Sequence, residues 1–284
     1  MRRLWLILMA MLMLSGSANA GWQERLSHKI DRIAKGKGMT IGVAFAYDGK
    51  KYAYNDKERF PLASVMKYHV AVAALLQELP LDSLIDVQAS DMRPDTYSPL
   101  RLLHPGADFR ITLADLLRWS VSQSDNNAND LVIRQCGGID RVEQIIGELG
   151  IGDFELNYNE SQQHDTPLRC YDNWTSPSAM TQLFMAYDHE ILGQVLSQST
   201  AGEDRIKSGL PNWAEMGHKT GTGPLLNGVR VAYNDAAVIK LPDGKRCYLA
   251  VFIKDSKETD ETNSFVISFI TKTIFDMFLR EELK

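Results

Sequence analysis

The run Ser64-Val65-Met66-Lys67-Tyr68-His69, continued at residues 70–76 by Val-Ala-Val-Ala-Ala-Leu-Leu, is the stretch of this chain that most constrains its fold. We expect a helix that begins at Ser64, reaches Leu79 and is closed by Pro80. A helix whose interior is apolar on every side is buried inside a domain rather than lying on its surface. The stretch therefore predicts a central helix, on which Lys67 is an exceptional cation.

Segments that favour strands lie at both ends of the chain, and segments that favour helices fill the middle. The predicted strands cover residues 39–46, 52–54, 215–222, 229–241 and 245–254. The predicted helices cover residues 23–34, 64–79, 112–122, 128–135, 140–149, 177–188 and 260–283. The fold class is thus α+β. An antiparallel sheet flanked by helices comes from residues 21–60 and 209–284, and an all-helical region over residues 61–208 is inserted between them.

Residues 1–20 have the pattern of a secretory signal peptide. Arg2 and Arg3 precede an apolar core at residues 4–14, and Ala18-Asn19-Ala20 is a small-x-small cleavage site. This apolar core is too short to span a bilayer. We therefore expect cleavage after Ala20 and a periplasmic or secreted protein that keeps no membrane anchor.

Composition limits the partners that this chain can have. Its 284 residues carry a net charge of −5, and loss of the leader makes the charge more negative. That balance argues against nucleic acid and anionic membranes, and we expect a monomer. Cys136, Cys170 and Cys247 allow one disulfide of unreadable pairing, but buried structural thiols are the preferred interpretation. Neither these cysteines nor the six histidines have metal-ligand spacing, so we expect no metal and no cofactor.

Three short motifs carry the chemistry. They are Ser64-x-x-Lys67, Ser124-Asp125-Asn126 and Lys219-Thr220-Gly221, in that order. Ser-x-x-Lys places a hydroxyl and an amine one helical turn apart on one face. The amine, or a base near it, can then take the serine proton. The other motifs supply a second hydroxyl and a second ammonium, which suit a leaving group and a substrate carboxylate. A given tripeptide is expected only about 0.05 times in a chain of this length, so the ordered set is a specific signal.

Each motif residue also has an ordinary structural explanation. Ser64 fits a helix N-cap, and Lys67 fits a surface lysine whose stem packs on apolar neighbours. Ser-Asp-Asn fits a polar loop, and Lys219 fits an exposed strand residue. For Ser64 the two interpretations are compatible, because a helix start presents free N–H groups and a partial positive charge.

The three motifs resemble those of class A serine β-lactamases, and the resemblance extends over nearly the whole chain after the leader. It implies the fold of β-lactamases and penicillin-binding proteins, with the site between the sheet and the helical region. It also implies that Ser64 is the nucleophile and that its N–H and that of Thr222 form an oxyanion hole. Ser124 would pass a proton to the departing lactam nitrogen, and Asn126 would hold the acylamino side chain of the substrate.

The same resemblance assigns the substrate carboxylate to the Lys219 strand. Lys219, Thr220 and Thr222 would bind it, and Gly221 would leave room for the substrate along the strand edge. Asn234 stands where an arginine is expected on the following strand, which leaves Arg230 as a substitute candidate. Tyr97 resembles the aromatic wall of the cleft, although a packed core tyrosine is an equally good interpretation.

The polar segment at residues 157–175 decides between sister functions. It is aperiodic, and an unstructured loop of this length is usually functional. The resemblance implies that Glu160 activates the water that cleaves the acyl-enzyme, whereas its ordinary explanation is a solvated loop acid. His164 replaces the asparagine of usual members, as in an extended-spectrum, cephalosporin-hydrolysing subgroup. The arginine–aspartate bridge that usually closes the loop is missing, so we expect a differently folded and roomier loop.

The predicted function is hydrolysis of the β-lactam amide of cephalosporins and penicillins through an acyl-enzyme on Ser64, which would confer antibiotic resistance. Two alternatives stay open. A D-alanyl-D-alanine peptidase shares Ser64, Lys67 and the Lys219 motif but lacks a glutamate poised for deacylation. A β-lactam sensor acylates and stops, and such sensors are tethered to a membrane.

Overall fold

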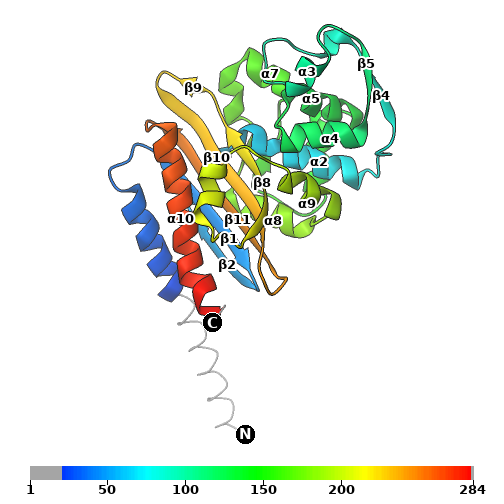
Figure 1. Ribbon diagram of the computed structural model, residues 1–284. Helices are drawn as coiled ribbons and strands as arrows, with labels where there is room; N and C mark the ends of the chain where they lie inside the picture. The colour runs from blue at the N-terminus through cyan, green and yellow to red at the C-terminus, as the bar shows by residue number, and fades with distance from the viewer. Residues whose placement is uncertain (1–20, 283–284) are drawn as a thin grey trace.

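The computed structural model describes residues 21–282, with side chains up to residue 278; the predicted signal peptide lies outside these residues. Figure 1 shows a sheet with helices on both faces and a helical region beside it. The main sheet is antiparallel with the order β2-β1-β11-β10-β8, and β9 pairs with β10. Its strands are β1 (Thr40–Tyr47), β2 (Lys50–Tyr54), β8 (Glu215–Thr222), β9 (Leu225–Leu226), β10 (Val229–Lys240) and β11 (Arg246–Ser256). Strands from both ends of the chain thus share one sheet, as predicted.

One face of this sheet is covered by an N-terminal helix over residues 21–34 and by α10 (Asp260–Glu282) (Figure 1). Between the sheet and these helices lies a dry core that includes Leu26, Phe45, Ile270 and Ile274. Burial of such side chains stabilises the layer by about 1.5–3 kcal/mol each. Within the described residues, no helix has the length and apolar character needed to cross a membrane.

The helical region packs against the other face and surrounds α2 (Met66–Leu76). Every residue of α2 from Met66 to Ala74 is buried, which confirms the predicted central helix, although the helix ends three residues before Leu79. The surrounding helices are α3 (Pro99–Leu103), α4 (Leu113–Ser122), α5 (Asn126–Gln135), α6 (Ile139–Gly147), α7 (Glu160–Asp165), α8 (Pro177–Ala186) and α9 (Glu190–Ser197). Short 3₁₀ turns cover η1 (Ala63–Val65), η2 (Ala89–Asp91) and η3 (Pro167–Tyr171), and η4 (Glu203–Lys207) is a π-helical turn.

Two small sheets complete the fold. A hairpin of β4 (Leu84–Val87) and β5 (Phe109–Thr112) flanks the helical region, and β3 (Phe60–Pro61), β7 (Trp174–Thr175) and β6 (Phe154–Glu155) form the other. The sequence patterns did not predict these strands, because two- to four-residue strands have no measurable period.

Side-chain caps fix where several helices begin. The Thr112 hydroxyl accepts the Asp115 N–H at the start of α4, and Asp125 does the same for Ala128 in α5. Ser176 caps α8 by accepting the N–H of Ala179. Such caps contribute about 1 kcal/mol each. They place the start of α5, and with it the Ser124 motif, against the end of α4.

The prediction of an unstructured loop at residues 157–175 is wrong. The segment contains α7 and η3. Asn159 and Gln162 form a capping box, in which the side-chain oxygen of each residue accepts the backbone N–H of the other. A polar six-residue helix has no apolar stripe, so hydrophobic periodicity could not reveal it.

Candidate active site

Ser64 lies at the centre of a short turn that leads into α2. It belongs to η1 and not to an N-cap, so that prediction is wrong; the turn has no side-chain cap. Ala63 precedes it with φ at 44°, a left-handed conformation that few residues other than glycine adopt. The buried Asn234 amide donates to the Pro61 carbonyl at 2.7 Å and so ties the approach to this turn to β10. Asn234 therefore anchors the turn that carries Ser64 to β10.

Lys67 is fully buried, and its side chain contacts the Ser64 hydroxyl. Its Nζ donates to Ser64 Oγ at 2.8 Å and to Asn126 Oδ1 at 2.8 Å, and it forms a very short contact with Glu160 Oε1. Three acceptors match the three N–H donors of an ammonium. The interpretation of Lys67 as a surface lysine is therefore wrong, and its nitrogen joins the proposed nucleophile to the proposed deacylation base.

Ser124, Asp125 and Asn126 face Lys67 from the α4–α5 junction. Ser124 has φ at 56°, a strained conformation of the kind that clusters at functional sites. The Asp125 carboxylate is buried and accepts the Ser98 hydroxyl and the Leu100 N–H. Burial raises the Asp125 pKa, while these hydrogen bonds oppose the rise. Asp125 thus fixes the junction, and Asn126 begins α5 rather than lying in the loop.

Lys219 reaches the site from β8, the edge strand of the sheet. It is buried, and its Nζ donates to Ser124 Oγ at 3.0 Å, so the exposed-strand interpretation is wrong. Burial, and next the Lys67 charge, hold the Lys219 pKa well below its ordinary value, against the attraction of Glu160. Two ammonium groups thus lie in one site, each hydrogen-bonded to a serine hydroxyl. Such a site favours an anionic substrate.

Gly221 is required by packing against the Ser64 turn. A Cβ there would lie 2.5 Å from the Leu62 carbonyl oxygen and 3.0 Å from Val65 Cγ2. The missing side chain therefore lets β8 approach the Ser64 turn, and the room that it leaves for substrate stays a prediction. Thr222, the next residue, is exposed.

Arg205 is a site residue that the sequence patterns did not reveal. It lies in η4 with only 6% of its surface exposed. Its guanidinium donates to Thr222 Oγ1 at 2.7 Å, to the Asn234 carbonyl at 2.6 Å and to the Gly221 carbonyl at 3.4 Å. The surrounding sequence, Glu-Asp-Arg-Ile-Lys, is typical of a solvated turn, so nothing in it marks a buried cation. Arg205 adds a third positive charge behind the Lys219 strand.

Glu160 begins α7 and is held by Asp130 of α5. Asp130 accepts the N–H of Glu160 at 2.8 Å, and both the N–H and the hydroxyl of Ser161, at 2.9 and 2.6 Å. Burial, then the Glu160 charge, raises the pKa of Asp130 to about 6 despite these hydrogen bonds. The Glu160 side chain is only 12% exposed and touches Lys67, so the solvated-acid interpretation is wrong.

Comparisons with known proteins agree with this geometry. A model of the beta-lactamase enzyme family matches residues 25–278. A β-lactamase of Bacteroides uniformis is 40% identical over 269 residues, which cover 89% of this chain and 91% of that protein. The extended-spectrum β-lactamase PER-1 of Pseudomonas aeruginosa is 32% identical over 271 residues, which cover 90% of this chain and 88% of that protein. The crystal structure of a class A β-lactamase from Bacteroides cellulosilyticus has a TM-score of 0.85 and 35% identity over 89% of this chain and 97% of that one.

The chain belongs to the beta-lactamase enzyme family. Its fold is that of class A, which confirms the resemblance and the predicted α+β class, and it is a serine β-lactamase. The three motifs of the sequence meet in one place, since Lys67 contacts Ser64 and Asn126 while Lys219 contacts Ser124. The loop glutamate, Glu160, joins them through Lys67.

Three other predicted residues of this β-lactamase lie at the margin or outside the cluster. Tyr97 is 62% exposed, so its interpretation as a core residue is wrong. His164 Nε2 lies 3.2 Å from an oxygen of Asp95, a residue outside the cluster. Arg230 forms a paired contact with Asp260, at 2.8 and 3.0 Å, so the arginine that serves the site is Arg205 and not Arg230.

The missing arginine–aspartate bridge of the long loop has a counterpart elsewhere in this β-lactamase. Arg93 pairs with Asp165 at 2.6 Å and donates to the Ser161 carbonyl at 3.3 Å, which ties α7 to the segment before Tyr97. At the loop's base, the Asn173 side chain accepts the N–H groups of Asn157 and Tyr158. Asn173 therefore closes the loop with an amide where usual members have an ion pair.

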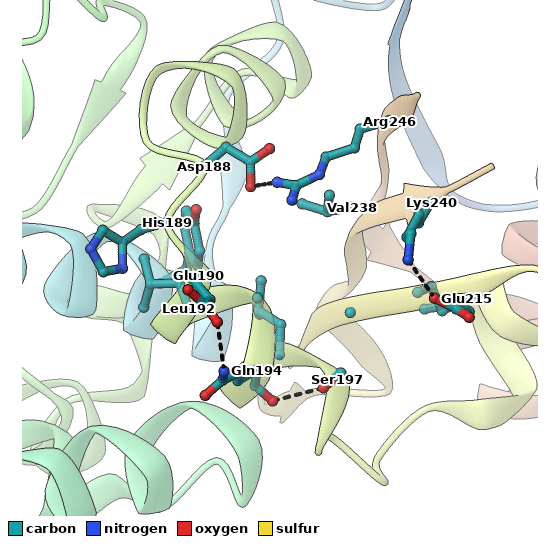
Figure 2. A pocket seen from close by; sticks show the side chains of 15 residues that line it. Asp188, His189, Glu190, Leu192, Gln194, Ser197, Glu215, Val238, Lys240 and Arg246 are labelled. Carbon is teal, nitrogen blue, oxygen red and sulfur yellow. Dashed lines mark hydrogen bonds and ion pairs between the residues drawn. The ribbon is translucent and has the colours of Figure 1, made fainter. Parts of the chain in front are cut away.

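A separate cavity of about 640 Å³ lies between α9 and the ends of β8 and β10 (Figure 2). Its two basic side chains are paired, Arg246 with Asp188 and Lys240 with Glu215, and Glu190 accepts a hydrogen bond from Gln194. None of its lining residues belongs to the serine cluster, although Tyr68 follows Lys67 directly. Because both of its cations are paired, this cavity lacks the unpaired cations that an anionic β-lactam needs, and the serine cluster is the better candidate for the active site.

Cys136, Cys170 and Cys247 are free and buried, which agrees with the interpretation of the three cysteines as structural thiols. Burial raises the pKa of Cys136 and Cys170 to about 12, so their thiols are inert at neutral pH.

Proposed function

We propose that this β-lactamase hydrolyses cephalosporins and penicillins through an acyl-enzyme on Ser64. The observation that carries the proposal is the Lys67 nitrogen, which contacts both the Ser64 hydroxyl and the Glu160 carboxylate. A hydroxyl bonded to a buried amine is the arrangement of an activated nucleophile. A carboxylate on the same amine distinguishes a hydrolase from a peptidase or sensor that lacks a deacylation base.

In the acylation step, Ser64 Oγ attacks the lactam carbonyl carbon while its proton passes to Lys67 or, through water, to Glu160. Because Lys67 uses three donors in the present arrangement, its transfer of one proton to Glu160 would have to precede its action as a base. The N–H groups of Ser64 and Thr222 stabilise the oxyanion, a contribution of about 3–4 kcal/mol per donor in comparable hydrolases. The C–N bond then breaks, and the Ser124 hydroxyl delivers its proton to the lactam nitrogen. Ser124 regains a proton from the base that took the Ser64 proton, which returns Lys67 and Glu160 to their starting protonation states.

In the deacylation step, Glu160 takes a proton from water, and the water oxygen attacks the ester carbonyl. Ser64 Oγ leaves and receives the proton that Glu160 took from the water, so the site returns to its starting state. The substrate carboxylate lies against Lys219, Thr220 and Thr222, and Asn126 holds the acylamino side chain. Arg205 supports this carboxylate site through the Thr222 hydroxyl. Tyr97 and His164 line the outer cleft in this proposal.

Secretion to the periplasm forms part of the proposal and rests on the leader at residues 1–20. The PER-1 relative bears the name of an extended-spectrum β-lactamase, which supports cephalosporins as substrates.

A chromogenic cephalosporin assay on the purified protein tests the function, with Ser64→Ala as the control. We expect turnover by the wild type and none by Ser64→Ala. Faster cleavage of a D-Ala-D-Ala peptide than of the cephalosporin would instead identify a peptidase. Stoichiometric acylation without turnover would identify a sensor.

A further inference from the structure

The turn that carries Arg205 has an unusual backbone at that residue. Arg205 has φ −97° and ψ −120°, which is non-helical inside η4. The ψ angle of a residue sets the direction of the next N–H. The Ile206 N–H therefore points away from the axis of the turn, and it donates to Oδ2 of Asp235 at 3.1 Å.

Asp235 connects three elements behind the Lys219 strand. It lies on β10 and is fully buried, and its second oxygen lies 2.9 Å from Nδ1 of the buried His218. His218 precedes Lys219 on β8, and successive strand residues point to opposite faces. The Asp235 carboxylate thus holds β8 on the face opposite Lys219 and holds η4 beside it.

The bond from Ile206 acts on the peptide group directly after Arg205. The Ser208 hydroxyl also donates to the Arg205 carbonyl of this peptide at 3.0 Å, from within the turn, and the Asp204–Ser264 hydrogen bond ties the turn to α10. Gly202, with φ at 77°, passes so close to β8 that a Cβ would lie 2.4 Å from Thr220 Cγ2. A rotation of the peptide between Arg205 and Ile206 would move the Arg205 Cα and swing the guanidinium away from Thr222 Oγ1, its partner at 2.7 Å.

We propose that Asp235 is a positioning residue for recognition of the substrate carboxylate, because it fixes the Arg205 backbone through the Ile206 N–H. The inference rests on the proposed function, since Arg205 matters only if Thr222 receives that carboxylate. The alternative is a purely structural role, in which Asp235 stabilises the fold without influencing substrate binding.

A double-mutant cycle between Asp235→Ala and Arg205→Ala tests the proposal. With a cephalosporin that bears its free carboxylate, we expect each variant to raise KM about tenfold or more while kcat changes by less than about threefold. Because Asp235 acts through Arg205, the double variant should show little more than the Arg205→Ala effect. With the methyl ester of the same cephalosporin, wild type and variants should differ little.

Asp235→Asn supplies the conservative variant. Its amide oxygen can still accept the Ile206 N–H, and its NH₂ can donate to His218 Nδ1 in the other tautomer. We expect KM to return to within about threefold of wild type. Ile274→Ala, which opens a cavity in the core beneath α10 and removes no hydrogen bond of η4, is the control for lost stability and should leave KM unchanged.

An unchanged KM in a folded Asp235→Ala variant, or additive effects in the double variant, would overturn the proposal. If Asp235→Ala does not fold, the test is instead hydrogen exchange of the Ile206 backbone amide, measured in the wild type and in Asp235→Asn. Strong protection supports the contact, and exchange at the rate of an exposed loop overturns it. A wild type that is inactive on β-lactams would sink the proposed function, and this exchange measurement would still report on the Asp235 contact.

Discussion

Asp130 and Glu160 are joined across two helices: the Asp130 carboxylate of α5 accepts the backbone N–H with which Glu160 begins α7. A carboxylate at a helix N-terminus satisfies free N–H groups and interacts favourably with the helix dipole. The same carboxylate lies near a second acid, the Glu160 side chain, and this proximity contributes to the raised pKa of Asp130. Asp130 thus positions the proposed deacylation base, Glu160, at the cost of repulsion between the two carboxylates.

Asp130→Ala should lower the deacylation rate more than the acylation rate, because it releases the start of α7 and with it Glu160. Loss of a capping carboxylate costs about 0.5–2 kcal/mol of stability. Pre-steady-state kinetics with a chromogenic cephalosporin should show a burst followed by slow turnover. Asp86→Ala, which removes an exposed acid of β4, is the control and should behave as wild type. Equal slowing of both steps would argue against this role.

The raised pKa of Asp130 predicts a pH-dependent stability. Its pKa of about 6 in the folded state lies above the ordinary value of 3.8 for an aspartate, so between these pH values the folded state binds more protons than the unfolded state. The contribution of Asp130 to stability therefore falls as pH rises from about 4 to 6 and stays constant above that. Urea unfolding should show that the free energy of unfolding of the wild type, relative to that of Asp130→Asn, decreases as pH rises over this window. A difference that is flat with pH would contradict the prediction.

Glu160→Ala should acylate and then stall, because the site keeps Ser64 and Lys67 but loses the acceptor for the water proton. Intact-protein mass spectrometry should detect a long-lived adduct of the cephalosporin. Ser64→Ala, with no nucleophile, should give no adduct under the same conditions. Unchanged turnover by Glu160→Ala would remove this residue from its proposed role.

Hydrophobic periodicity predicted the parts of this fold that depend on a continuous apolar face. The buried α2 and the antiparallel order of β10 and β11 are such parts, because long patterned segments determine their own burial. The helix α7 and the small strands were not predictable in this way. Their stability comes from tertiary partners such as Asp130, which is distant in sequence and carries no local signal.

The candidate site was predictable to the extent that short motifs encode it. Ser64, Lys67, Ser124 and Lys219 were found because their spacing is specific, and the structure brings these four side chains into hydrogen-bond contact in two pairs. Arg205 was missed because its site depends on the backbone of η4. Arg230 was a wrong candidate because its partner, Asp260, lies at the start of another helix.

The left-handed backbone at Ser124 predicts opposite effects on stability and activity. Relief of a left-handed residue by glycine gains about 1–2 kcal/mol, and the greater freedom of unfolded glycine offsets roughly 0.5–1 kcal/mol of that. Ser124→Gly should therefore be more stable than Ser124→Ala by up to about 1 kcal/mol. Both variants lack the hydroxyl, so both should lose turnover to a similar degree. Thermal unfolding and steady-state kinetics of the pair check this, and a less stable Ser124→Gly would contradict it.

The depressed pKa of Lys219 predicts an alkaline limit to activity. Burial and the Lys67 charge favour the neutral amine, so Lys219 loses its proton at a lower pH than an exposed lysine does. Once it is neutral, the substrate carboxylate loses a cation, and kcat/KM falls as pH rises. Lys219→Arg keeps its charge at all accessible pH values. Its kcat/KM should therefore be lower near neutral pH, because the guanidinium does not fit the Ser124 contact, and should no longer fall at alkaline pH. Profiles from pH 6 to about 10, with Lys254→Arg as the control, measure this, and an identical alkaline fall in Lys219→Arg would assign the limit to another group.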